Sequence, residues 1–66
     1  MKFATILKEL REEKGLSQMQ LAKKLDISQS AIARWELSKT EPTAGALLLL
    51  SGFFEVSVGY LLGVED

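Results

Sequence analysis

Helix-start residues recur at short intervals along the chain, and they constrain the fold more than any other feature. Apolar residues at helical spacing follow each of four such positions: Ser17, Ser28, Thr43 and Ser57. A Ser or Thr hydroxyl at this position accepts a hydrogen bond from the first turn of the helix that follows. Gln20 stands three residues after Ser17, which is the spacing of a capping box. The pattern therefore predicts a series of short helices, and no segment has the alternation typical of a β-strand.

Five helices follow from these signals. The first begins near Phe3, repeats apolar residues at helical spacing through Leu10, and ends before Gly15. The other four are predicted after the cap residues, at about 18–25, 29–36 or 37, 44–54 and 58–62, the last closed by Gly63. A length of 66 residues allows one domain, so we expect a single compact all-α domain over residues 1–66.

The composition argues against catalysis. The sequence has no Cys and no His, which removes thiolate nucleophiles, the commonest general base and the usual zinc ligands. No pair of carboxylates and no glycine-rich phosphate loop stands out. We therefore expect no enzymatic activity, no metal and no cofactor. No secretory signal is visible and no apolar run approaches the roughly 20 residues of a membrane span, so we expect a cytoplasmic protein without a membrane partner.

Charge is distributed unevenly along the chain. Residues 1–40 hold eight basic and five acidic residues, a balance of +3. Residues 41–66 hold four acidic residues and no basic one, a balance of −4, which brings the whole chain to −1. One half of the protein could thus face nucleic-acid phosphates while the other half faces away.

Residues 17–37 have the geometry of a helix-turn-helix: two short helices joined by a three-residue turn and preceded by a longer helix. The two helices must cross closely, and the small residue Ala22 suits the crossing. Ile27 can pin the turn to the core. Ile32 and Trp35 share a face of the second helix, so both are expected in the core. The opposite face of that helix is then free to enter a DNA major groove.

The segment "SQMQLAKKLDISQSAIARWE", Ser17–Glu36, resembles the DNA-binding motif of the Cro/CI-type phage repressors and the related xenobiotic-response-element-type regulators. Three further segments resemble the family's first helix, its loop after the recognition helix and its closing helix: "LKELREEKGLSQ", "SKTEPT" and "FFEVSVGYLLG". The resemblance extends from Phe3 to Gly63. It implies a compact five-helix bundle of the lambda-repressor-like type.

The resemblance also implies roles for individual residues. The residues that would read base edges lie on the second helix of the motif: Gln29, Ser30, Ala33 and Arg34. A Gln can pair with adenine, whereas Arg34 could read guanine or hold a phosphate. Phosphate contacts would come from Gln18, Ser28, Lys39 and Thr40, with Gln18 also bracing Gln29. Arg11 and Glu36 resemble the family's structural pair between the first helix and the recognition helix.

The sequence departs from the family at several positions. Asp26 and Ser38 stand where the family usually has Gly; Asp tolerates the left-handed conformation better than most residues, so the turn should survive. Gly45, Leu49, Gly52 and Gly59 stand where the family often has charge.

The fourth helix has more apolar residues than one core-facing stripe needs. Leu48, Leu49 and Phe53 are in excess of the core spacing. Excess apolar surface on one side of a small protein usually marks an interface. Family dimers pair through this region, so our hypothesis is that Leu49, Phe53 and Gly59 lie at a homodimer contact. The alternative is an over-buried core helix.

The sequence thus predicts sequence-specific binding of double-stranded DNA, as a homodimeric transcriptional repressor on an inverted-repeat operator. The alternative is a protein-interaction module, antitoxin-like or an adaptor, that uses the Leu-rich fourth helix. The two readings use different faces of the molecule.

Overall fold

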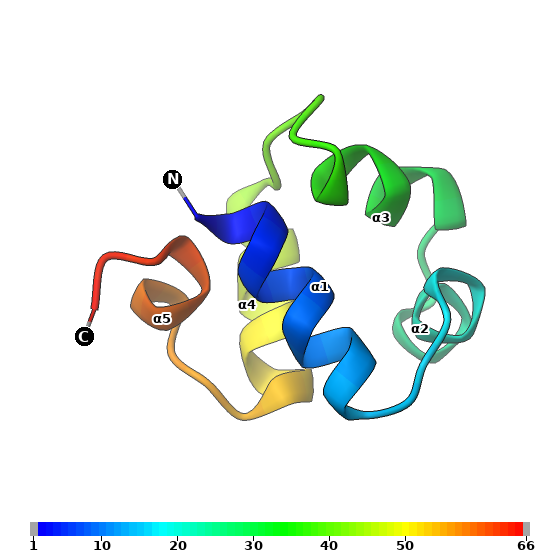
Figure 1. Ribbon diagram of the computed structural model, residues 1–66, viewed down its shortest axis with the longest axis horizontal. Coiled ribbons are helices and arrows are strands. Elements are labelled where there is room, and N and C mark those ends of the chain that lie inside the picture. Colours follow the sequence, from blue (N-terminus) through cyan, green and yellow to red (C-terminus); the bar gives the residue numbers. More distant parts are fainter. Residues whose placement is uncertain (1, 66) are drawn as a thin grey trace.

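The computed structural model describes residues 2–65 and contains five helices in this part of the chain, with no strand (Figure 1). The helices are α1 (Phe3–Glu13), α2 (Gln18–Leu25), α3 (Gln29–Glu36), α4 (Ala44–Phe54) and α5 (Val58–Leu62). The predicted all-α, five-helix fold is confirmed.

Four helices begin where the cap residues predict. The hydroxyls of Ser17, Ser28, Thr43 and Ser57 each accept a hydrogen bond from the backbone N–H three residues later, at 3.0, 3.2, 3.1 and 3.0 Å. The Gln20 side chain accepts the Ser17 N–H at 2.8 Å, so the predicted capping box is complete. Helix α1 differs, because Lys2 provides no side-chain cap.

The connections after the helices use left-handed backbone. Gly15 and Gly63 have φ of 68° and 74°, a conformation that glycine adopts without a steric penalty. Asp26 has φ 56° in the turn between α2 and α3, as its tolerance for this conformation predicts. Ser38 and Glu55 have φ of 59° and 57° although neither is glycine. The family's glycine turns are therefore reproduced here at a cost in backbone strain.

The core receives side chains from all five helices. Its buried members are Phe3, Leu7, Leu21, Ala22, Leu25, Ile32, Trp35, Leu50, Phe54 and Leu61. Helix α1 packs against both α3 and α5, and it lies between them in Figure 1. The rings of Phe3 and Trp35 meet edge to face with centroids 6.1 Å apart. The predicted core positions Ala22, Ile32 and Trp35 are confirmed, and Ile27 packs against this core from the turn.

Candidate nucleic-acid interface

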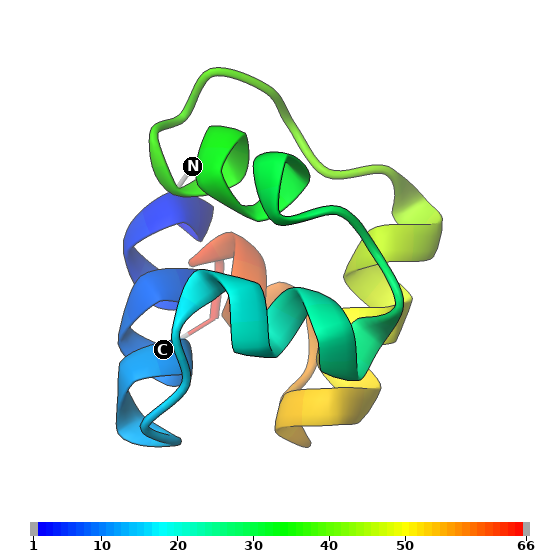
Figure 2. The ribbon, with the colours of Figure 1, turned by 90° about the vertical axis from the view of Figure 1, so that its right-hand side faces the viewer.

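Helix α3 is anchored on one side and open on the other. Ile32 is fully buried and Trp35 is 9% exposed, so the inner face is held by the core. Gln29, Ser30 and Arg34 are exposed on the outer face, with Ala33 half-buried beside them. Figure 2 shows α3 and the loop 37–43 along one edge of the molecule, with α2 beneath. The structure therefore brings all four predicted base-reading residues onto one helix at the surface.

The loop after α3 starts with a tight turn. The backbone N–H of Ser38 donates to the Trp35 carbonyl at 3.1 Å, and that of Lys39 donates to the Arg34 carbonyl at 2.9 Å. Lys39 and Thr40 are both exposed. The left-handed Ser38 thus performs the turn that the family's Gly performs, and it keeps Lys39 at the carboxyl end of α3.

Ser28 is exposed at the amino end of α3. Its hydroxyl caps the helix and lies 3.3 Å from the Ser30 hydroxyl. The Ser28 hydroxyl oxygen therefore caps α3 and also contacts Ser30, one of the predicted base-reading residues.

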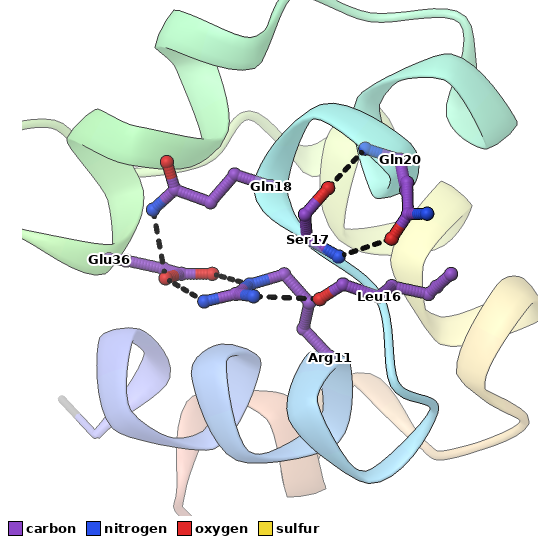
Figure 3. A network of polar contacts seen from close by, with 6 residues as sticks. All are labelled: Arg11, Leu16, Ser17, Gln18, Gln20 and Glu36. Carbon is purple, nitrogen blue, oxygen red and sulfur yellow. Dashed lines mark hydrogen bonds and ion pairs between the residues drawn. The ribbon is translucent and has the colours of Figure 1, made fainter.

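A polar network fastens α3 to α1 and α2 (Figure 3). Arg11 donates to both carboxylate oxygens of Glu36, from Nε at 2.7 Å and from Nη2 at 2.9 Å. Arg11 also donates from Nη1 to the Leu16 carbonyl at 2.8 Å. The Arg11 and Glu36 side chains are only 11% and 5% exposed. The hydrogen bond to Glu36 raises the pKa of the Arg11 guanidinium above its ordinary value, although burial opposes this, so Arg11 stays charged. The family's structural pair is thus present.

A model of a helix-turn-helix family matches residues 7–61. The chain belongs to the Cro/CI-type helix-turn-helix family. The domain is 41% identical over 66 residues to the transcriptional activator BcrR of Enterococcus faecalis, covering 100% of this chain and 32% of BcrR. In Bacillus subtilis (strain 168) it is 37% identical over 60 residues to the transcriptional regulator ImmR, covering 91% of this chain and 47% of ImmR.

A second Bacillus subtilis relative, the uncharacterized transcriptional regulator YqaE, is 38% identical over 64 residues, covering 97% of this chain and 55% of YqaE. The chain therefore spans between about a third and about half of the length of these relatives. One of the three is named as a helix-turn-helix transcriptional activator and two as helix-turn-helix transcriptional regulators, and this chain matches part of each.

The Gln18 side chain meets α3 near the carboxyl end of that helix. Its side-chain nitrogen donates to Glu36 at 3.1 Å, near the carboxyl end of α3. Gln29 opens α3, seven residues earlier, which is about 10 Å along a helix. Gln18 therefore braces Glu36 in this helix-turn-helix domain, and not Gln29 as expected.

The predicted interface residues of the helix-turn-helix domain differ in exposure. Leu49 is 42% exposed on α4. Phe53 is half-buried, and Lys14 Nζ lies 5.5 Å from its ring centroid, within reach of a cation–π contact. A Cβ at Gly59 would collide with the Glu65 carboxylate, so the Glu65 side chain covers Gly59 within the protomer.

The exposed side of α4 carries no charged side chain. Its exposed residues before Glu55 are Ala44, Gly45, Leu48, Leu49 and Gly52. Leu48 is the most exposed of the leucines, at 68%. Tyr60 and Val64 add exposed apolar side chains in the same half of the domain, and the sequence analysis did not single them out. For Tyr60, the off-core position in the helical spacing of α5 was the available signal, whereas Val64 follows the end of that helix.

Met19 and Leu37 are two further exposed apolar residues that the sequence analysis missed, at 53% and 64%. Both belong to the basic half. In residues 2–65 no helix is long and apolar enough to cross a membrane, and no group of acidic side chains there could hold a metal ion.

Proposed function

We propose that the domain binds double-stranded DNA sequence-specifically by placing α3 in a major groove. The observation that carries this proposal is the outer face of α3, where Gln29, Ser30 and Arg34 are exposed while Ile32 holds the helix to the core. Polar side chains on a rigid helix can meet base edges in a fixed register. Gln29 is suited to adenine, and Arg34 to guanine or a phosphate. Ala33 offers a methyl group that can contact thymine.

Phosphate contacts would set the register of α3 on the duplex. We assign them to Gln18, Ser28, Lys39 and Thr40, which flank α3 and are exposed or half-exposed. This part of the chain carries the positive charge balance of +3, whereas residues 41–66 carry −4. The charge asymmetry favours the approach of DNA to the α2–α3 side.

The domain would act as a homodimer on an inverted repeat, with two α3 helices roughly 34 Å apart in successive major grooves. The exposed Leu48 and Leu49 support this arrangement, because paired copies would remove them from water. The proposed regulatory outcome is repression, since a protein bound over a promoter blocks polymerase without further machinery. Its place of action is then the cytoplasm, and the proposed role needs neither catalysis nor a cofactor.

The test is selection from a random double-stranded DNA library, followed by a salt titration on the best duplex. We expect an inverted repeat whose affinity falls steeply as salt rises. Gln29→Ala should relax the preference at particular base pairs, whereas Lys39→Ala should weaken all duplexes alike and lower the salt slope by about one. Retention of DNA without any sequence preference would contradict the proposal.

A second function is supported by the same exposed leucines. The α4 surface could hold a different protein, as in an antitoxin-like or adaptor module, while α3 remains on DNA. Analytical ultracentrifugation separates the two arrangements. A domain that stays monomeric at high micromolar concentration, alone and on the selected duplex, would contradict the homodimer and favour a protein partner.

A further inference from the structure

The Glu36 carboxylate accepts hydrogen bonds from two residues, Arg11 and Gln18. Arg11 already pairs with both of its carboxylate oxygens, and this bidentate contact suffices to neutralise the carboxylate. The third donor is the Gln18 side-chain nitrogen, which comes from another helix (Figure 3). In residues 2–65 it makes the one side-chain hydrogen bond that joins α2 to α3.

The bond to Glu36 leaves part of the Gln18 amide available. A Gln side-chain nitrogen carries two hydrogens, and Glu36 accepts one of them. The side chain is half-exposed, so the second hydrogen can reach a ligand outside the protein. A DNA phosphate is such a ligand, because its oxygens only accept hydrogen bonds.

We propose that Glu36 is a positioning residue for DNA binding: it orders the Gln18 amide in the free protein and directs its second N–H to a phosphate. This inference rests on the proposed function. A free Gln side chain loses rotamer freedom when it binds, and ordering it beforehand avoids that loss. The gain per ordered side chain corresponds to about two- to tenfold in affinity.

If the charge of Glu36 alone mattered, removing Glu36 would have the opposite effect on DNA affinity. If Glu36 acted on DNA only through its negative charge, removing it would leave the Arg11 charge unpaired and strengthen binding to every phosphate. A variant that removes both charges together eliminates this effect. Arg11→Met/Glu36→Met replaces the pair by apolar side chains of similar length, an exchange that buried ion pairs often tolerate without loss of stability.

The experiment uses the duplex selected from the random library, made as a series with one neutral methylphosphonate at each position. The unsubstituted protein should bind more weakly to the duplex whose methylphosphonate replaces the phosphate that Gln18 contacts. Gln18→Ala identifies that phosphate, because it should not lose affinity there. Lys39→Ala identifies a second phosphate in the same way, as the matched control.

For the Arg11→Met/Glu36→Met variant we expect the methylphosphonate at the Gln18 phosphate to cost about two- to tenfold less affinity than it costs the unsubstituted protein. The affinity lost through the methylphosphonate at the Lys39 phosphate should be unchanged. If the double variant lost as much affinity as the unsubstituted protein when the Gln18 phosphate is neutralised, the inference would be overturned. A Gln18→Ala variant that behaves like the unsubstituted protein at every phosphate would also overturn it. In both cases sequence-specific binding would stand. Failure to select any duplex would overturn the proposed function, and this role with it.

A second measurement needs no variant, so it can overturn the inference even if the double variant unfolds. NMR relaxation of side-chain amides in the free protein compares Gln18 with Gln29, which is exposed on α3. We expect the Gln18 amide to be the more restricted of the two on the picosecond-to-nanosecond timescale. Equal mobility would overturn the ordering role of Glu36.

Discussion

The α2–α3 pair and the α4–α5 pair are built by the same local rules but held by different forces. Each of the four helices begins at a Ser or Thr cap. The α2–α3 pair is then fastened to α1 by the Arg11–Glu36–Gln18 network, whose two charged side chains are 11% and 5% exposed. The α4–α5 pair lies in a half without basic residues and joins the core through apolar side chains such as Leu50 and Leu61.

This difference separates the part of the domain that holds a helix rigidly from the part that offers a surface for association with another protein. A helix that reads bases must be held at a fixed angle, and directional polar contacts do this better than apolar packing alone. A surface that associates with another protein needs uncharged area that water leaves readily, and the exposed side of α4 offers it. The same 66-residue scaffold can therefore present two unlike faces.

The largest effect should come from breaking the polar network. Arg11→Met leaves the Glu36 carboxylate buried without its cation, and we expect a loss of about 3–5 kcal/mol in the free energy of unfolding. Urea denaturation measures it. Lys8→Met, on the exposed side of the same helix, is the control and should change stability by no more than about 0.5 kcal/mol. Equal effects of the two substitutions would mean that the network does not hold α3.

A cavity in the other region should cost slightly less. Leu50 is fully buried on α4, so Leu50→Ala should lower the free energy of unfolding by about 2–5 kcal/mol. Leu48 is 68% exposed on the same helix, so Leu48→Ala should cost no more than about 0.5 kcal/mol. Thermal melts of both variants give the comparison. A small effect at Leu50 would show that α4 contributes little to the shared core.

Adhesion can be tested apart from stability. Leu49→Lys places a charge on the exposed side of α4, and we expect it to weaken the proposed homodimer about tenfold or more, or 1.4 kcal/mol. Sedimentation equilibrium measures the dimer. Affinity for the selected inverted repeat should fall while affinity for a single half-site stays unchanged. Loss of half-site affinity would show that the two regions are not separable.

The smallest effects concern turns that both regions share. Asp26, Ser38 and Glu55 adopt left-handed backbone, so replacement by Gly should raise the free energy of unfolding by about 0.5–1 kcal/mol each. Gly15→Ala is the reverse control: no atom would touch the added Cβ, so only backbone strain acts, at a cost of about 1 kcal/mol. If Ser38→Gly lowers stability, the Ser38 turn is not strained.

Most of the fold and part of the candidate site were predictable. The starts of α2 to α5 follow from cap residues that lie three positions from the N–H groups they satisfy. The outer face of α3 follows from the burial of Ile32 and Trp35. The partner of Gln18 did not follow, because Glu36 lies 18 residues away and the two meet only through the packing of α2 against α3.

The sequence by itself determined the number and limits of the helices, because caps, helical spacing and turn residues act within a few positions along the chain and need no tertiary contact. Only the tertiary structure decided which polar groups meet and which apolar groups stay exposed. Lys14 reaches Phe53, and Glu65 covers Gly59, through the packing of separate segments. Those contacts depend on the relative placement of helices, which the shared core sets and no local pattern records.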